Sequence, residues 1–138
     1  MKTGVLDLNV FTKQDVITAF YTTFRDPVTL ANGLIDAWFE LALGQYELEI
    51  EPTDYDAREA RFPEKTTRPV INTLAYMMKV YYCEREVSRV IKVNNIITKD
   101  ITLNGNGDTK RFALEELNVA KARVDDSINK IKTSWYQN

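Results

Sequence analysis

The sequence predicts a mainly α-helical protein, a small bundle of about four helices with an extended β-hairpin-like arm before the C-terminal helix. Three observations predict this fold. Apolar residues recur at helical spacing in several stretches, one Pro-led stretch is apolar nearly all round, and short β-branched runs with turn residues lie between residues 94 and 108. With 138 residues, 44% of them hydrophobic, the whole chain is expected to form a single domain with its own core.

Capping residues mark the first two predicted helices. Thr12 and Asp15 have the spacing of a capping box, and a helix that follows them has one apolar side made of Val16, Ile17, Phe20 and Phe24. Asp26-Pro27 predicts the start of the second helix, because Asp accepts amide hydrogen bonds at an N-cap and Pro has no N–H to leave unpaired. That helix is expected to run to about Tyr46, with a largely apolar face made of Leu30, Leu34, Trp38, Leu41 and Gln45.

The next segment, Glu47–Glu64, is acidic and contains two prolines. Glu47–Glu51 alternates polar and apolar residues, which is typical of a strand but fits the end of the second helix equally well. The remainder is expected to be a loop with a turn around Asp56–Arg61.

The third predicted helix is the centre of the fold. Pro69 suits its first turn, and Val70–Cys83 is apolar or aromatic almost throughout, which indicates burial on all sides. The other helices of the chain would cover it, either alone or together with a neighbouring subunit. After Cys83 the pattern becomes charged, and three basic residues there form a candidate charged interface: Arg85, Arg89 and Lys92.

The segment Asn94–Asp108 has a different character, with β-type runs around Thr98-Lys99-Asp100 and turn-forming residues after them. An isolated hairpin cannot hide all of its apolar residues, so the segment is predicted to be an interaction arm that adds a strand to a neighbour. A hairpin folded back on its own helices is the competing interpretation. The candidate contact residues are Ile96, Ile97, Ile101, Leu103, Asn104 and Gly105.

The C-terminal helix is expected to start after Asp108 or Thr109 and to carry one apolar stripe, interrupted at Lys121. The stripe comprises Leu114, Leu117, Val124, Ile128, Ile131 and Trp135.

The residues that usually carry catalysis are scarce in this sequence. It contains no histidine and a single cysteine, Cys83, which lies in the apolar third helix and is expected to be a buried structural thiol. Asp100–Arg111 has part of the spacing of a calcium-binding EF-hand, but Arg111 stands where that loop needs a glutamate. No dinucleotide or phosphate-binding loop is present. The sequence therefore predicts no enzyme, no metal site and no cofactor.

Charge is divided unevenly along the chain. Residues 1–64 contain 12 acidic and 5 basic residues, a net charge of -7, whereas residues 65–138 contain 8 acidic and 13 basic residues, a net charge of +5. This is either compositional drift or the mark of a polar molecule whose acidic region faces a neighbour's basic region. The overall charge of -2 gives no reason to expect free nucleic acid or a membrane as the partner.

The order of these elements resembles the small helical head–tail connector, or adaptor, proteins of tailed phages. The resemblance covers roughly Asp26–Trp135. It is carried by the capped helix that ends in an acidic loop, the Pro-led apolar helix with its Tyr81-Tyr82-Cys83-Glu84-Arg85-Glu86 passage, and the extended segment Asn94–Asp108 before the terminal helix, in which Ile101–Gly107 is the most distinctive piece. It implies a structural virion protein, made in the host cytoplasm, that forms a homo-oligomeric ring, a dodecamer, on the portal protein and joins the capsid to a neck or tail protein. Nucleic acid would then be met only incidentally, in a channel, and no small-molecule substrate is implied. The alternative from a different class is a small intracellular binding or regulatory module that docks through its final amphipathic helix.

Overall fold

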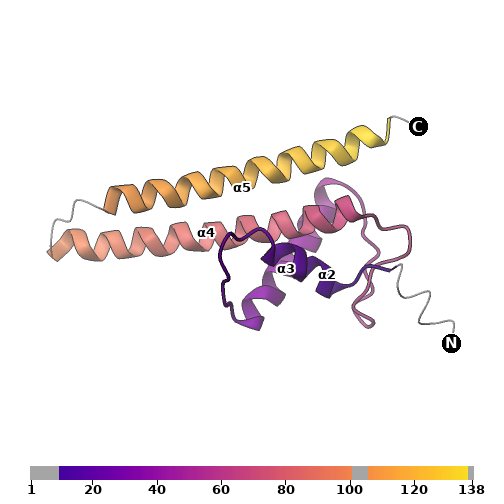
Figure 1. Cartoon of the computed structure of the whole chain (residues 1–138), viewed down its shortest axis with the longest axis horizontal. Helices are drawn as coiled ribbons and strands as arrows, with labels where there is room; N and C mark the ends of the chain where they lie inside the picture. The colour runs from indigo at the N-terminus through magenta and orange to yellow at the C-terminus, as the bar shows by residue number, and fades with distance from the viewer. Residues whose placement is uncertain (1–9, 101–105, 137–138) are drawn as a thin grey trace.

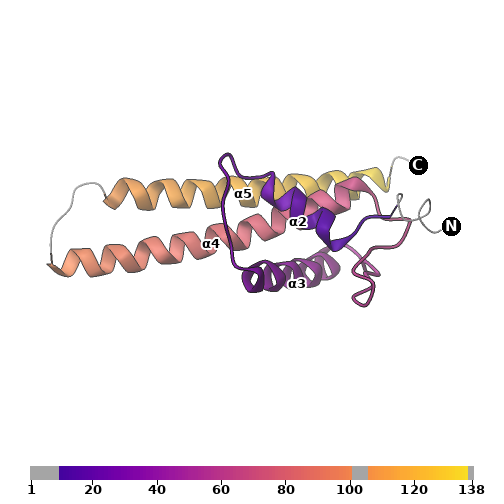
Figure 2. The same cartoon turned by 60° about the horizontal axis from the view of Figure 1, so that its bottom comes forward.

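The computed structural model describes the backbone of residues 10–100 and 106–136, and the side chains of residues 10–93 and 108–136. In these ranges the chain forms four helices and no named strand, which confirms the mainly helical class. The helices are α2 (Lys13–Tyr21), α3 (Asn32–Glu49), α4 (Arg68–Asp100) and α5 (Asn106–Ser134). The two long C-terminal helices lie side by side in opposite directions. The two shorter helices lie at the end of this pair that holds the first half of α4, against which they pack (Figures 1 and 2).

Helix α4 is the central element, since α2, α3 and α5 all pack against it. Ile71, Leu74, Met77 and Met78 in its first half have no exposed surface. The central position predicted for Val70–Cys83 is thus confirmed, but burial on all sides is reached only in part, since Val70, Tyr76 and Val80–Tyr82 are half-buried.

Helix α5 lies on α4 with the predicted stripe. Its buried residues are Leu117, Ala120, Val124, Ile128 and Ile131. Ala120 continues the stripe where Lys121 was expected to interrupt it, whereas Leu114 and Trp135 at the two ends are exposed. A hydrogen bond between the hydroxyl groups of Thr73 and Ser127 joins the two helices beside the core.

Helix α2 has the predicted capping box. The carboxylate of Asp15 accepts a hydrogen bond from the amide of Thr12 at 2.7 Å, and the Thr12 hydroxyl accepts one from the amide of Asp15 at 3.3 Å. Val16 and Phe20 are fully buried on its inner side.

Helix α3 begins at Asn32, after an N-cap residue Ala31 that makes no side-chain cap, and not at Asp26-Pro27 as predicted. The reason lies in Phe24, whose ring packs edge-on against Phe20 and Tyr82. Because Phe24 fixes the chain at this point, the residues between it and Asn32 form the connection that crosses to the start of α3 (Figure 2). Asp26-Pro27 lies in this connection and therefore starts no helix.

The predicted face of α3 is only partly right. Trp38 is buried and Leu30 and Leu34 pack against the core, but Leu41, expected there, is 56% exposed. The buried residues of α3 are Ile35, Trp38, Phe39, Ala42, Leu43 and Tyr46. This face carries three aromatic side chains, so its burial removes more apolar surface from water than burial of the leucine face would.

The acidic segment resolves both remaining ambiguities. Glu47–Glu49 belongs to α3, so the strand interpretation of Glu47–Glu51 is wrong and the helical one is confirmed. The turn predicted at Asp56–Arg61 is present: the amide of each residue donates to the carbonyl of the other, at 2.9 and 3.2 Å.

The β-hairpin-like arm is not supported. Asn94–Asp100, including Ile96 and Ile97, continues α4 as helix, and α5 begins at Asn106, earlier than predicted. Ile101, Leu103, Asn104 and Gly105 lie outside the described residues. The β-branched residues that suggested strands lose only a few tenths of a kcal/mol each in a helix, and extending an existing helix needs no new nucleus.

The first prediction concerns the centre of the fold. Replacing Leu74 or Met78 with Ala is expected to lower the free energy of unfolding by about 2–5 kcal/mol, because each truncation removes buried contacts and leaves a cavity. Val119→Ala is the control, since Val119 is 61% exposed, and should change it by no more than about 0.5 kcal/mol. Chemical denaturation measures all three. Changes below about 0.5 kcal/mol at both buried positions would show that α4 is not central.

Candidate interaction surfaces

The clearest unoccupied surface is the outward face of α3. Five residues at alternating spacings of three and four form what we call the outer stripe: Leu34, Ala37, Leu41, Gly44 and Leu48. Leu34, at its start, is half-buried against the core, and the other four residues are exposed. Leu41 is 56% and Leu48 87% exposed. This spacing is that of a helix that packs against another helix. The stripe could have been found in the sequence, but Leu34 and Leu41 had been assigned to the core-facing side.

Gly44 lies in the outer stripe, and no packing contact in the described part of the chain requires a glycine there. A Cβ added at this position would meet no atom within 4 Å. A glycine inside a helix costs about 1 kcal/mol relative to alanine. The stripe is therefore flat at its middle, as close approach by a second helix requires.

The charged residues of α3 all have one sign. The helix contains Asp36, Glu40, Glu47 and Glu49 and no lysine or arginine. Three of the carboxylates have partners. Asp36 pairs with Lys13 at 2.8 Å, Glu47 accepts hydrogen bonds from the amide and hydroxyl of Thr53, and Glu49 accepts one from the side-chain amide of Gln45 at 2.7 Å. Glu40 and Glu49 are both exposed. The stripe thus has an acidic border.

The second surface is the part of the α4–α5 hairpin that projects beyond α2 and α3 (Figures 1 and 2). Here α4 loses the cover that α2 and α3 give to its first half, and four residues lie on it within little more than two turns: Arg85, Arg89, Lys92 and Val93. We call this the basic face of α4. Glu86 pairs with both arginines, at 3.4 Å for Arg85 and 2.9 Å for Arg89, so positive charge remains in excess. The face brings together the three residues predicted as a charged interface.

The projecting half also has a thin core. Its buried residues are Cys83, Val87, Leu117 and Ala120. Beyond them, none of the side chains described at residues 88–93 and 108–112 is buried. Phe112 and Val93 are more than half exposed. Two helices that bury so little against each other gain stability from a further partner.

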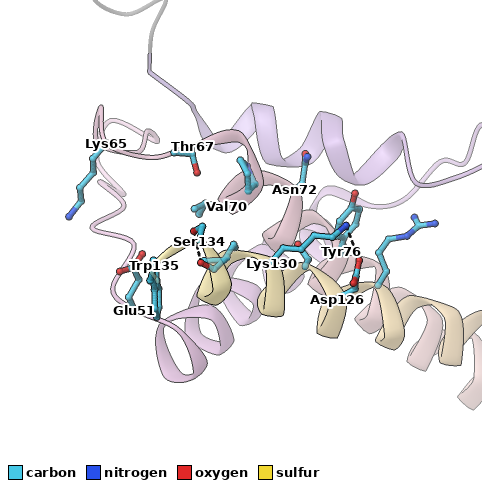
Figure 3. A pocket seen from close by; sticks show the side chains of 14 residues that line it. Glu51, Lys65, Thr67, Val70, Asn72, Tyr76, Asp126, Lys130, Ser134 and Trp135 are labelled. Atoms are coloured by element: carbon cyan, nitrogen blue, oxygen red, sulfur yellow. Dashed lines mark hydrogen bonds and ion pairs between the residues drawn. The ribbon is translucent and has the colours of Figure 1, made fainter. Parts of the chain in front are cut away.

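Two grooves follow the seam between α4 and α5. The first, about 620 Å³, lies near Trp135. Lys130 pairs there with Asp126 at 3.1 Å, as Figure 3 shows, and the guanidinium of Arg123 lies 5.4 Å from the ring centre of Tyr76. Lys65, also in its lining, pairs with Asp54 at 2.8 Å, so each basic residue of this groove already has a partner.

The second groove, about 750 Å³, is lined by residues of the α2–α3 connection, α4 and α5, among them Lys79 and Cys83. The ammonium of Lys79 lies 3.6 Å from the ring centre of Phe24 and donates to the carbonyl of Thr23 at 3.2 Å. Burial lowers the pKa of Lys79 and raises the pKa of the Cys83 thiol to about 11. The cysteine is thus a packed side chain whose nucleophilic thiolate is disfavoured.

In the described ranges no three His, Cys, Asp or Glu side chains are grouped so as to hold a metal ion. No helix in these ranges is at once long enough and apolar enough to cross a membrane.

Comparisons with protein-family models, with curated proteins and with solved structures find no match to this chain.

The second prediction concerns Cys83. Because its pKa is raised from 9.0 to about 11 in the folded chain, we expect an aromatic disulfide reagent at pH 8 to modify the native protein at least about tenfold more slowly than the denatured one. The same shift means that the thiol's contribution to stability is complete below pH 9 and is lost as the pH rises towards 11. Equal rates in the native and denatured protein would show that Cys83 is accessible and reactive.

Proposed function

We propose that this protein is a non-enzymatic structural protein that works by self-assembly, as a head–tail connector of a tailed phage. In this role, copies of the chain form a ring on the portal and offer a surface to the next neck or tail protein. The order of the helices and the acidic loop supports the connector role by resemblance, and the surface of α3 supports self-assembly on physical grounds.

The observation that carries the proposal is that α3 is apolar on two opposite faces and only one is covered. A helix that is apolar all round is normally buried all round. Solvent-exposed Leu41 and Leu48, with Gly44 between them, form a contiguous strip that a soluble monomer has no use for. The strip therefore fits a subunit that completes its burial in an assembly.

The charges of α3 favour a ring over a symmetric dimer. If the outer stripes of two copies faced each other, the acidic residues of both would border one contact, and like charges facing one another cost free energy. A contact between two different surfaces avoids this, and such head-to-tail contacts produce closed rings or filaments.

The alternative, a regulatory module that docks through the apolar stripe of its last helix, is less well supported. That stripe is already packed against α4, where Leu117, Val124, Ile128 and Ile131 are buried. It would become available only if the central hairpin opened.

The third prediction tests self-assembly. Leu41→Glu with Leu48→Glu is expected to weaken self-association more than about tenfold, because charges enter an apolar contact at its centre. Val119→Glu, an equally exposed apolar position on α5, is the control and should leave association unchanged. Sedimentation velocity over a concentration series measures the effect. A wild-type chain that remains monomeric throughout, or equal loss in the control, would contradict the proposal.

The connector role has its own test in the native particle. Cross-linking followed by mass spectrometry is expected to join this chain to other copies of itself and to the portal. A particle in which the chain occurs once, in contact with no other copy, would exclude the ring.

A further inference from the structure

We infer that the outer stripe of α3 in one copy binds the basic face of α4 in a second copy. This inference rests on the proposed self-assembly and adds to it the two surfaces that meet. The two surfaces do not cover each other within one chain, because Leu41, Gly44 and Leu48 are exposed and the half of α4 that carries the basic face extends beyond α3 (Figure 2).

The two surfaces match in length and in form. The outer stripe extends over about 21 Å from Leu34 to Leu48, and the projecting part of α4 from Arg85 to Asp100 extends over about 22 Å, at about 1.5 Å per residue. Both are regular helices. A helix laid along a stripe of this spacing places its side chains between the leucines, and Gly44 lets the two backbones approach closely there.

Charge selects the second copy's α4 over the other exposed surfaces. Glu40 and Glu49 border the stripe, and Arg89 and Lys92 are exposed on the basic face next to Val93, which is 51% exposed. The basic residues of α5 are interspersed with five carboxylates, and two of them are paired, Arg111 with Asp108 at 3.0 Å and Lys130 with Asp126. On the basic face of α4, by contrast, three basic residues accompany one carboxylate, Glu86. The basic face of α4 thus combines an uncovered helix surface, a surplus of positive charge and an exposed apolar residue.

The contact also remedies the thin core of the projecting half of the hairpin. The helix pair there buries only Cys83, Val87, Leu117 and Ala120. A third helix along α4 would cover the side that α2 and α3 leave open. Each copy would give α3 to one neighbour and α4 to the other, which is a head-to-tail arrangement.

The experiment reverses charge on each surface separately. One variant carries Glu40→Lys and Glu49→Lys on α3, and the other carries Arg89→Glu and Lys92→Glu on α4. All four positions are exposed. Glu49 accepts a hydrogen bond from Gln45, and Arg89 pairs with Glu86, so each double variant also loses one surface contact within the chain. The matched control is Lys121→Glu with Lys132→Glu on the outer side of α5, which changes the net charge by the same amount as the α4 variant.

Each variant alone is expected to self-associate more than about tenfold more weakly than the wild type at low salt, since it brings like charges together. An equimolar mixture of the two variants is expected to recover association, because the reversed α3 of one meets the reversed α4 of the other. A chain with all four substitutions should recover it as well. The control should associate like the wild type. Sedimentation velocity and native mass spectrometry follow the species formed.

The outcomes separate this inference from the proposal on which it rests. If the wild type assembles and both variants assemble equally well, or if the mixture does not recover association, this pair of surfaces is wrong and self-assembly stands. If the wild type never self-associates and the α3 variant instead loses binding to a different protein in the particle, both the inference and the proposed ring are wrong. A Leu41→Cys and Val93→Cys chain that forms intermolecular disulfides under oxidation supports the inference.

Discussion

The burial of α4 on three sides is the constraint on which the rest of the structure depends. Its first half is too apolar to face water, so α2, α3 and α5 must all pack against it, and they meet there as one core. Because α4 is far longer than α2 or α3, only α5 accompanies it to its end. The division of the molecule into a thick globular end and a projecting hairpin follows from this difference in helix length.

Aromatic packing decides how α3 lies on α4. Trp38 packs edge-on against Phe20 and Tyr82, and Phe39 does so against Tyr55 and Phe62. Each such pair adds about 0.5–1.5 kcal/mol to the free energy of burial, and together they favour the aromatic face over the leucine face. The choice leaves Leu41 and Leu48 outside. A helix at the edge of one small domain cannot bury two opposite faces. The outer stripe is thus exposed because the aromatic face of α3 packs more favourably in the core.

Local signals predicted local structure, and the failures have a common cause. Thr12–Asp15 caps α2 and Asp56–Arg61 turns as expected, since both depend on neighbours in sequence. Three predictions failed, wholly or in part, where the structure depends on more than neighbours in sequence: the start of α3, the buried face of α3 and the helical state of Asn94–Asp100. The packing of Phe24 on Tyr82 moved the start of α3, and the aromatic network turned its buried face away from Leu41. At Asn94–Asp100, elongation of α4 prevailed over weak β propensity. The sequence singled out Arg85, Arg89 and Lys92, which the structure places on one face of α4 and whose role as an interface stays a prediction, but it did not single out the outer stripe.

The fold places the acidic residues of α3 and the basic residues in the projecting half of α4 on different surfaces of the molecule. The acidic residues of the first part of the sequence include every charged residue of α3, whereas four of the six basic residues of α4 lie on the half that projects. An isolated surface ion pair contributes little to affinity, about 0–1 kcal/mol, so these charges cannot by themselves hold two copies together. They can set which surfaces meet and in which direction, because every wrong pairing puts like charges side by side. The leucines of the outer stripe would then supply the affinity, and the acidic border would make the contact head-to-tail.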